Sequence, residues 1–186
     1  METPRLFLAQ ACNNAWSNHR LLVACEKLSA EEFADASRTS FFPSISATLN
    51  HNLIVDWYYV DALEGGDLGL AAFASDVPCP NFADLAREQR AVDQRLIRFC
   101  TGLCPEDLSR EVRMQRRDHV QVDCVARTLL HLLQHQIHHR GQAHAMLSGT
   151  SVKPPQLDEF FMAGEVHLRA EELAEIGLSE AQIWGC

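Results

Sequence analysis

The stretch of this chain that is richest in potential chemistry runs from His131 to Met146. It reads HLLQHQIHHRGQAHAM and holds five of the nine histidines. It contains no proline, and helix-forming residues flank it on both sides. On an α-helix, residues four apart lie about 40° apart around the axis, so His135 and His139 project from one face, one turn apart. Two imidazoles at this spacing can bind one divalent ion from a single helix. The stretch therefore predicts a metal site.

The two faces of this predicted helix differ in character. His131 and His138 share a polar face, whereas His135 and His139 lie at the border of an apolar face or inside it. An imidazole that points into a core needs partners for both ring nitrogens, and a metal ion supplies one of them. The alternative interpretation is that both are core histidines held by hydrogen bonds. The four-residue spacing of His135 and His139 favours metal binding over this alternative.

A third ligand must come from another element, because one helix seldom supplies three. His51 is the candidate, since it belongs to an apolar helical stripe in TLNHNLIVDWYYVDAL. His19 and His119 are alternatives. Three neutral imidazoles leave the ion at least one open position, where bound water becomes acidic, so an open site indicates chemistry or ligand exchange. Because the ligands must be neutral, we expect metal affinity to fall below about pH 6.

Composition excludes several classes of function. The chain has 186 residues and a net charge of −9, which disfavours a nucleic-acid partner. We find no signal peptide and no apolar run long enough to span a membrane, so we expect a cytoplasmic protein. The seven cysteines form no CxxC pair and are expected to be reduced thiols.

Helical periodicity and capping residues predict an all-α fold, an antiparallel four-helix bundle. A short hairpin within residues 110–121 is expected before the last long helix. We expect a bundle domain over residues 1–160 and a C-terminal extension, residues 161–186, packed on the same domain. The predicted long helices are Arg5–Leu28, Ser44–Leu63 with Gly65-Gly66 behind it, Phe82–Cys100 capped by Asn81, and a helix capped by Asp123 that ends near Ser148.

Three blocks of sequence resemble the DinB superfamily of metal-dependent proteins: NNAWSNHRLL, FFPSISATLNHNLIVDWYYVDAL and HLLQHQIHHRGQAHAMLSG. The resemblance covers about residues 5–160. It implies an antiparallel four-helix bundle, commonly a homodimer, that binds a divalent metal, zinc or nickel, through three histidines. Carried over by position, these are His51, His135 and His139.

Other matched positions carry plainer expectations. Asp56 points about 140° away from His51 on the helical wheel, so direct contact with that ring is not expected. Arg140 points away from the histidine pair and is expected to pair with Asp56 or Asp61. Gly141 is expected to permit a close approach of helices.

Several functions stay open from the sequence. By resemblance, the first is a metal-dependent enzyme acting on a small-molecule substrate, of the S-transferase kind, that uses a low-molecular-weight thiol as cofactor. Hydrolysis by metal-bound hydroxide is the second. A metal-dependent binding or stress-response protein without turnover is the third, and a bundle with purely structural histidines is the fourth. No general base is identified beyond the free histidines His131 and His138.

Overall fold

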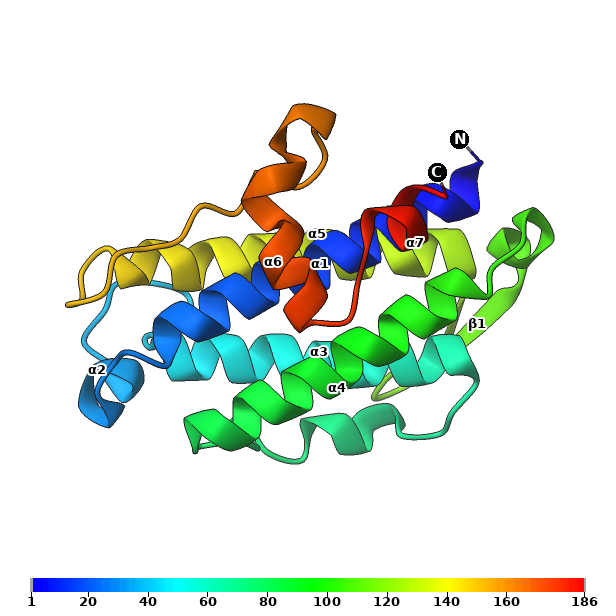
Figure 1. Ribbon diagram of the computed structural model, residues 1–186. Coiled ribbons are helices and arrows are strands. Elements are labelled where there is room, and N and C mark those ends of the chain that lie inside the picture. Colours follow the sequence, from blue (N-terminus) through cyan, green and yellow to red (C-terminus); the bar gives the residue numbers. More distant parts are fainter. Residues whose placement is uncertain (1, 186) are drawn as a thin grey trace.

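The computed structural model describes residues 2–185, and most of them lie in helices (Figure 1). The predicted helical class is confirmed. No helix within the described residues combines the length and the apolar content that crossing a membrane requires. The long helices are α1 (Thr3–Cys25), α3 (Ile45–Glu64), α4 (Phe82–Thr101) and α5 (Val125–Leu147). The shorter ones are α2 (Ala30–Ala34), α6 (Val166–Glu175) and α7 (Glu180–Trp184), with 3-10 turns at Gly69–Phe73, Pro105–Ser109 and Ala163–Glu165.

The boundaries of α3 and α4 follow from capping chemistry that is legible in the sequence. The Ser44 hydroxyl accepts a hydrogen bond from the backbone N–H of Ala47 at 3.0 Å, and Asn81 accepts one from Ala83 at 2.8 Å. Gly65 ends α3 with a positive φ of 81°, a conformation that costs glycine little. The cap at Asn81 and the glycine stop agree with the predicted ones, whereas Ser44 is the N-cap and not, as predicted, the first residue of the helix.

The start of α5 differs from the prediction that Asp123 caps it. Strand β1 (Glu111–Gln115) pairs antiparallel with β2 (Val120–Cys124), so the predicted hairpin is present and extends to Cys124. The ladder keeps Asp123 extended, and Cys124 takes the N-cap position without a side-chain capping bond. The backbone N–H of Val125 instead donates to the carbonyl of Arg110, at 3.0 Å. The hairpin thus runs directly into α5.

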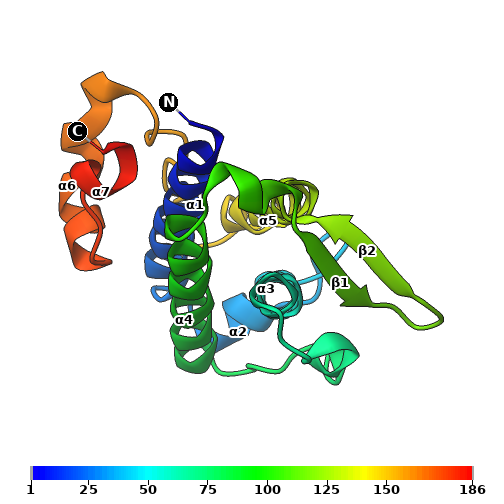
Figure 2. The ribbon, with the colours of Figure 1, turned by 90° about the vertical axis from the view of Figure 1, so that its right-hand side faces the viewer.

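The long helices pack in pairs around one apolar core. Helix α1 contacts α4 and α5, and α3 contacts the same two helices. Trp16, Leu53, Leu96 and Leu129, one from each helix, are almost completely buried. The hairpin lies against α3 and α5 on one side of the molecule, and α6 and α7 lie beside α1 on another (Figure 2).

Helix α6 and the segment before it are held to α1 by a charged contact around Arg20. Its guanidinium donates to Glu172 at 2.7 and 2.8 Å and to Glu159 at 2.8 Å, and it stacks on the Trp16 ring at 4.2 Å. The Trp16 indole N–H also donates to Glu172, at 2.7 Å. Trp16 therefore contributes to helix packing.

A cluster of buried polar side chains links all four long helices. Its members are Asn14 and Asn18 from α1, Asp56 from α3, Gln89 and Asp93 from α4, and Gln136 and Arg140 from α5. Because hydrogen bonds join members of the cluster from different helices, the cluster constrains how the helices slide against one another.

The sequence suggested that Arg140 pairs with Asp56 or Asp61. Within residues 2–185 it forms no ion pair with either, although the charge of Asp56 acts on its guanidinium. Its guanidinium donates to the Oδ1 atoms of Asn14, at 2.6 Å, and Asn18, at 3.1 Å. The helix faces turn Arg140 toward α1, so amide oxygens are its hydrogen-bond partners. The expectation for Gly141 is also wrong, since a Cβ at that position would meet nothing within 4 Å.

The two carboxyl groups of the cluster are strongly perturbed by burial. Asp93 accepts from Asn18 at 3.0 and 3.2 Å, from Gln89 at 3.2 Å and from Asn14 at 3.3 Å. Burial nevertheless raises the pKa of Asp93 to about 6. Burial and the nearby Asp93 raise the pKa of Asp56 well above its ordinary value, although Gln89 and Gln136 donate to it. Burial lowers the pKa of Arg140 to about 10, a value at which the group stays charged at neutral pH.

We predict that Arg140→Met destabilises the protein by about 3–5 kcal/mol, because it removes the buried cation and leaves amide oxygens without donors. Arg127→Met is the matched control on the same helix: Arg127 is exposed and pairs with Asp123 at 3.4 Å. That change should cost less than about 0.5 kcal/mol. Urea unfolding of both variants measures the difference, and equal losses would contradict the role given to Arg140.

Candidate metal centre

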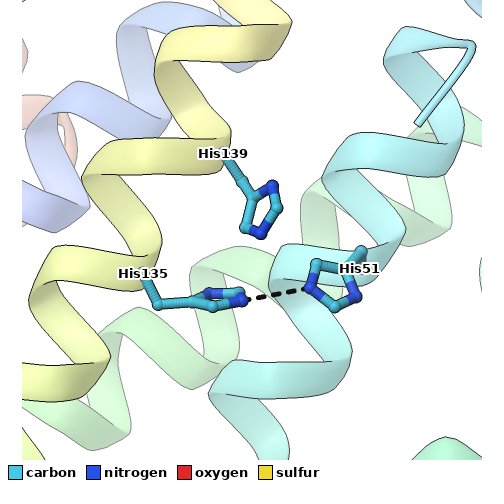
Figure 3. A group of neighbouring side chains, drawn as sticks. All are labelled: His51, His135 and His139. Atoms are coloured by element: carbon cyan, nitrogen blue, oxygen red, sulfur yellow. Dashed lines mark hydrogen bonds between the residues drawn. The ribbon is translucent and has the colours of Figure 1, made fainter. Parts of the chain in front are cut away.

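Three histidines from two helices face one another in the seam between α3 and α5 (Figure 3). One ligand nitrogen from each of His51, His135 and His139 lies within 4.8 Å of the other two. The ring centroids are 4.5–5.0 Å apart. The structure thus brings together the three residues that the sequence singled out. The alternatives lie elsewhere, since His19 pairs with Glu175 and His119 with Asp118.

The spacing of the nitrogens fits a shared cation. The Nε2 atoms of His51 and His135 are 3.0 Å apart. Two metal–nitrogen bonds of about 2.0–2.1 Å that enclose a tetrahedral angle place their nitrogens about 3.3 Å apart. Only a small outward movement of the rings would therefore admit an ion.

Hydrogen bonding orients one of the three rings. Nδ1 of His139 donates to the amide oxygen of Gln142 at 2.8 Å, which leaves the Nε2 lone pair free for a metal. Nδ1 of His135 is buried and has no hydrogen-bond partner within residues 2–185, so packing holds that ring. Sequence reasoning missed Gln142, although its position three residues after His139 on a helix was a usable signal.

The surroundings favour neutral imidazoles. Burial, together with the neighbouring His139, lowers the pKa of His51 to about 4, against a weaker opposing effect of Asp76. Burial and the other histidines lower the pKa of His135 to about 3. Burial also lowers the pKa of His139. At neutral pH all three rings are therefore uncharged, the form in which imidazole binds a metal.

Two phenylalanines form an aromatic flank at the end of the seam where α3 begins. The Phe42 ring centroid is 4.4 Å from that of His51 and 5.5 Å from that of His139. Phe41 packs edge-on against Phe42 at 4.9 Å and is 78% exposed. A large exposed apolar ring beside a group of metal-ligating side chains offers a contact for the apolar part of a ligand.

The opposite flank of the triad is polar. His131 is exposed, and its ring centroid is 6.5 Å from that of His135 and 5.2 Å from that of Tyr59. His138 is also exposed, and its Nε2 lies 3.2 Å from Nε2 of Gln142. These two histidines lie beside the triad and outside it. Asp56 forms no hydrogen bond with His51 within residues 2–185, because its carboxyl accepts from Gln89 and Gln136 instead.

The triad contains no fourth ligand side chain. Among residues 2–185, no further histidine, cysteine, aspartate or glutamate joins the three-histidine group. A divalent ion bound there would keep at least one position for water or for a substrate atom. Such an arrangement suits catalysis or ligand exchange better than a structural role.

A family model matches most of the chain. The family model described as DinB family matches residues 2–172, and it therefore includes the triad and most of α6. No curated protein matches the chain.

We predict that the affinity for Zn²⁺ stays within about tenfold between pH 7.5 and 5.5 and falls steeply only as the pH approaches about 4. Protons compete with the metal only below the pKa of each ligand, and these pKa values are lowered. The fall should thus occur at a more acidic pH than the value of about 6 that ordinary histidines suggest. Calorimetric titration at each pH measures the affinity, with circular dichroism as a control for unfolding. A loss of about tenfold per pH unit starting at pH 6.5 would contradict it.

Proposed function

The chain belongs to the DinB family, and from this premise we propose that it binds one divalent metal ion through His51, His135 and His139 and acts on a small molecule at the open position. The observation that carries the proposal is the convergence of three neutral imidazoles from two helices without a fourth ligand side chain in residues 2–185. Three nitrogen ligands suit zinc or nickel.

We propose further that the reaction is the transfer of a low-molecular-weight thiol to an organic electrophile. A bound divalent ion supplies a Lewis acid that lowers the pKa of a thiol. The exposed His131 ring, 6.5 Å from His135 between centroids, is placed to take the proton that the thiol releases. The sulfur then forms a bond to the electrophilic carbon, and the leaving group departs with its electron pair. Phe41 and Phe42 would contact the apolar part of the electrophile.

The scaffold proposed for this chemistry is an antiparallel four-helix bundle, assembled as a homodimer. The pairwise packing of α1, α3, α4 and α5 supports the bundle. Leu130 and Ile137 on α5 are 55% and 46% exposed and offer apolar surface for a second copy. Residues 161–186 would form an extension of the same domain, supported by the contacts of α6 and α7 with α1.

We predict that His51→Ala lowers the affinity for Zn²⁺ by at least about a hundredfold, because it removes one of three ligands. His167→Ala should change it by less than about threefold, since that exposed ring lies on α6, outside the triad and its hydrogen-bond partners. Elemental analysis of untagged protein and calorimetric titration measure both variants. Metal bound to the folded state at a thousand times its Kd should also stabilise the wild type by about 4 kcal/mol. Unchanged stability after chelation would favour purely structural histidines.

We predict that metal-loaded wild-type protein conjugates a thiol to an activated aryl halide, and that His51→Ala lowers the rate by about a hundredfold or more, to the uncatalysed level. The His167→Ala protein serves as the control and should keep its activity, because that exposed histidine lies on α6. The rate is followed by release of the halide. Equal rates for wild type and His51→Ala would remove the enzyme proposal and leave a metal-dependent binding protein.

A further inference from the structure

A half-buried arginine lies at the hairpin end of the seam that contains the triad. Tyr59 follows His51 by eight residues on α3, a distance of about 12 Å along the helix axis. On α5, His131 precedes His135 by one turn, and its ring centroid is 5.2 Å from that of Tyr59. The guanidinium of Arg116, from the hairpin turn, lies over the rings of Tyr58 and Tyr59 at 5.4 and 5.8 Å.

Neutral side chains fix the orientation of this guanidinium. Nε of Arg116 donates to Oε1 of Gln121 at 3.0 Å, and Nη2 donates to the Tyr59 hydroxyl at 3.0 Å. No carboxylate of the described chain forms an ion pair with it. By contrast, the partly buried Arg20, Arg38 and Arg95 and the fully buried Arg169 each pair with an aspartate or glutamate. Arg5 and Arg140 also lack an ion pair within residues 2–185, but they bond to backbone carbonyl or amide oxygens in the C-terminal contact and in the polar cluster, away from the triad.

A guanidinium that is held in place without a counter-ion is suited to bind an anion. Its planar set of N–H groups matches the oxygens of a carboxylate or phosphate, and the tyrosine rings reduce the conformational entropy lost on binding. The net charge of the chain is −9, so most of its surface repels anions. An anion would therefore bind only where an unpaired cation such as Arg116 attracts it locally.

We propose that Arg116 binds an anionic group, a carboxylate or phosphate, of the same thiol whose sulfur reaches the triad, an inference that rests on the proposed function. The substrate class is then a thiol that carries its anionic group several bonds from the sulfur. The thiol would extend from the triad past His131 and Tyr59 toward the hairpin. The aromatic flank at Phe41 and Phe42 would be left to the apolar electrophile.

The test follows thiol binding through the thiolate-to-cobalt charge-transfer absorption of the full-length, Co²⁺-loaded protein, without turnover. Two matched pairs of probes separate the sources of the anion. N-acetylglutathione and its diethyl ester differ in carboxylates, and 4′-phosphopantetheine and pantetheine differ in a phosphate. We expect the wild type to bind the anionic member of at least one pair at least about tenfold more tightly than its neutral partner.

Arg116→Gln should reduce this preference to less than about twofold and leave the affinity for the neutral thiols unchanged. Arg117→Gln is the matched control, because Arg117 is the exposed neighbour in the same turn, and it should retain the preference. Cobalt content and circular dichroism verify that the variants fold. A second measurement needs no variant: the preference of the wild type should weaken several-fold between about 0.02 and 0.5 M KCl.

The outcomes separate the two proposals. A charge-transfer band with no preference for anionic thiols, or a preference that Arg116→Gln leaves intact, overturns the role of Arg116 and leaves the thiol reaction standing. The absence of any band with all four thiols, in cobalt-loaded wild type, overturns the thiol reaction and the role of Arg116 together.

Discussion

The hydrogen-bonded cluster around Asp93 and Arg140 is the constraint on which the rest of the structure depends. An apolar core tolerates small translations of one helix along another, whereas directional bonds between buried polar groups do not. The cluster contains side chains from α1, α3, α4 and α5. Gln136 and Arg140 on α5 directly follow His135 and His139 in the chain. The hydrogen bonds that fix the position of α5 along its axis therefore also fix where His135 and His139 lie relative to α3.

The seam between α3 and α5 has two chemically different ends with the triad between them. One end presents phenylalanine rings, of which Phe41 is largely exposed. The other presents Tyr59 and Arg116, with a guanidinium bound only by neutral side chains. Because the two flanks differ, a pair of substrates with unlike polarity would bind in one order along the seam. The burial that lowers the pKa of His51 keeps the centre neutral between these ends.

Local signals in the sequence were sufficient to predict that the four long helices exist and which residues form the triad. Asn81 caps α4 through bonds to the residues two and three positions on, and the four-residue spacing of His135 and His139 needs only one helix. The partners of Arg140 were not predictable in this way. They depend on how α5 is rotated against α1, and no pattern within either helix encodes that angle.

The predicted start of α5, with Asp123 as its cap, was also wrong because of contacts outside the helix. Pairing with β1 extends strand β2 past Asp123 to Cys124. This direct junction of β2 with α5 has a consequence for how the chain can vary in length. One residue inserted between Cys124 and Val125 would change the phase of the hairpin relative to the helix by about 100°. Either the β1–β2 pairing or the orientation of His135 and His139 toward His51 would then be lost. Insertions are therefore confined to the turn, where the N–H of Arg116 donates to the carbonyl of His119 at 2.8 Å.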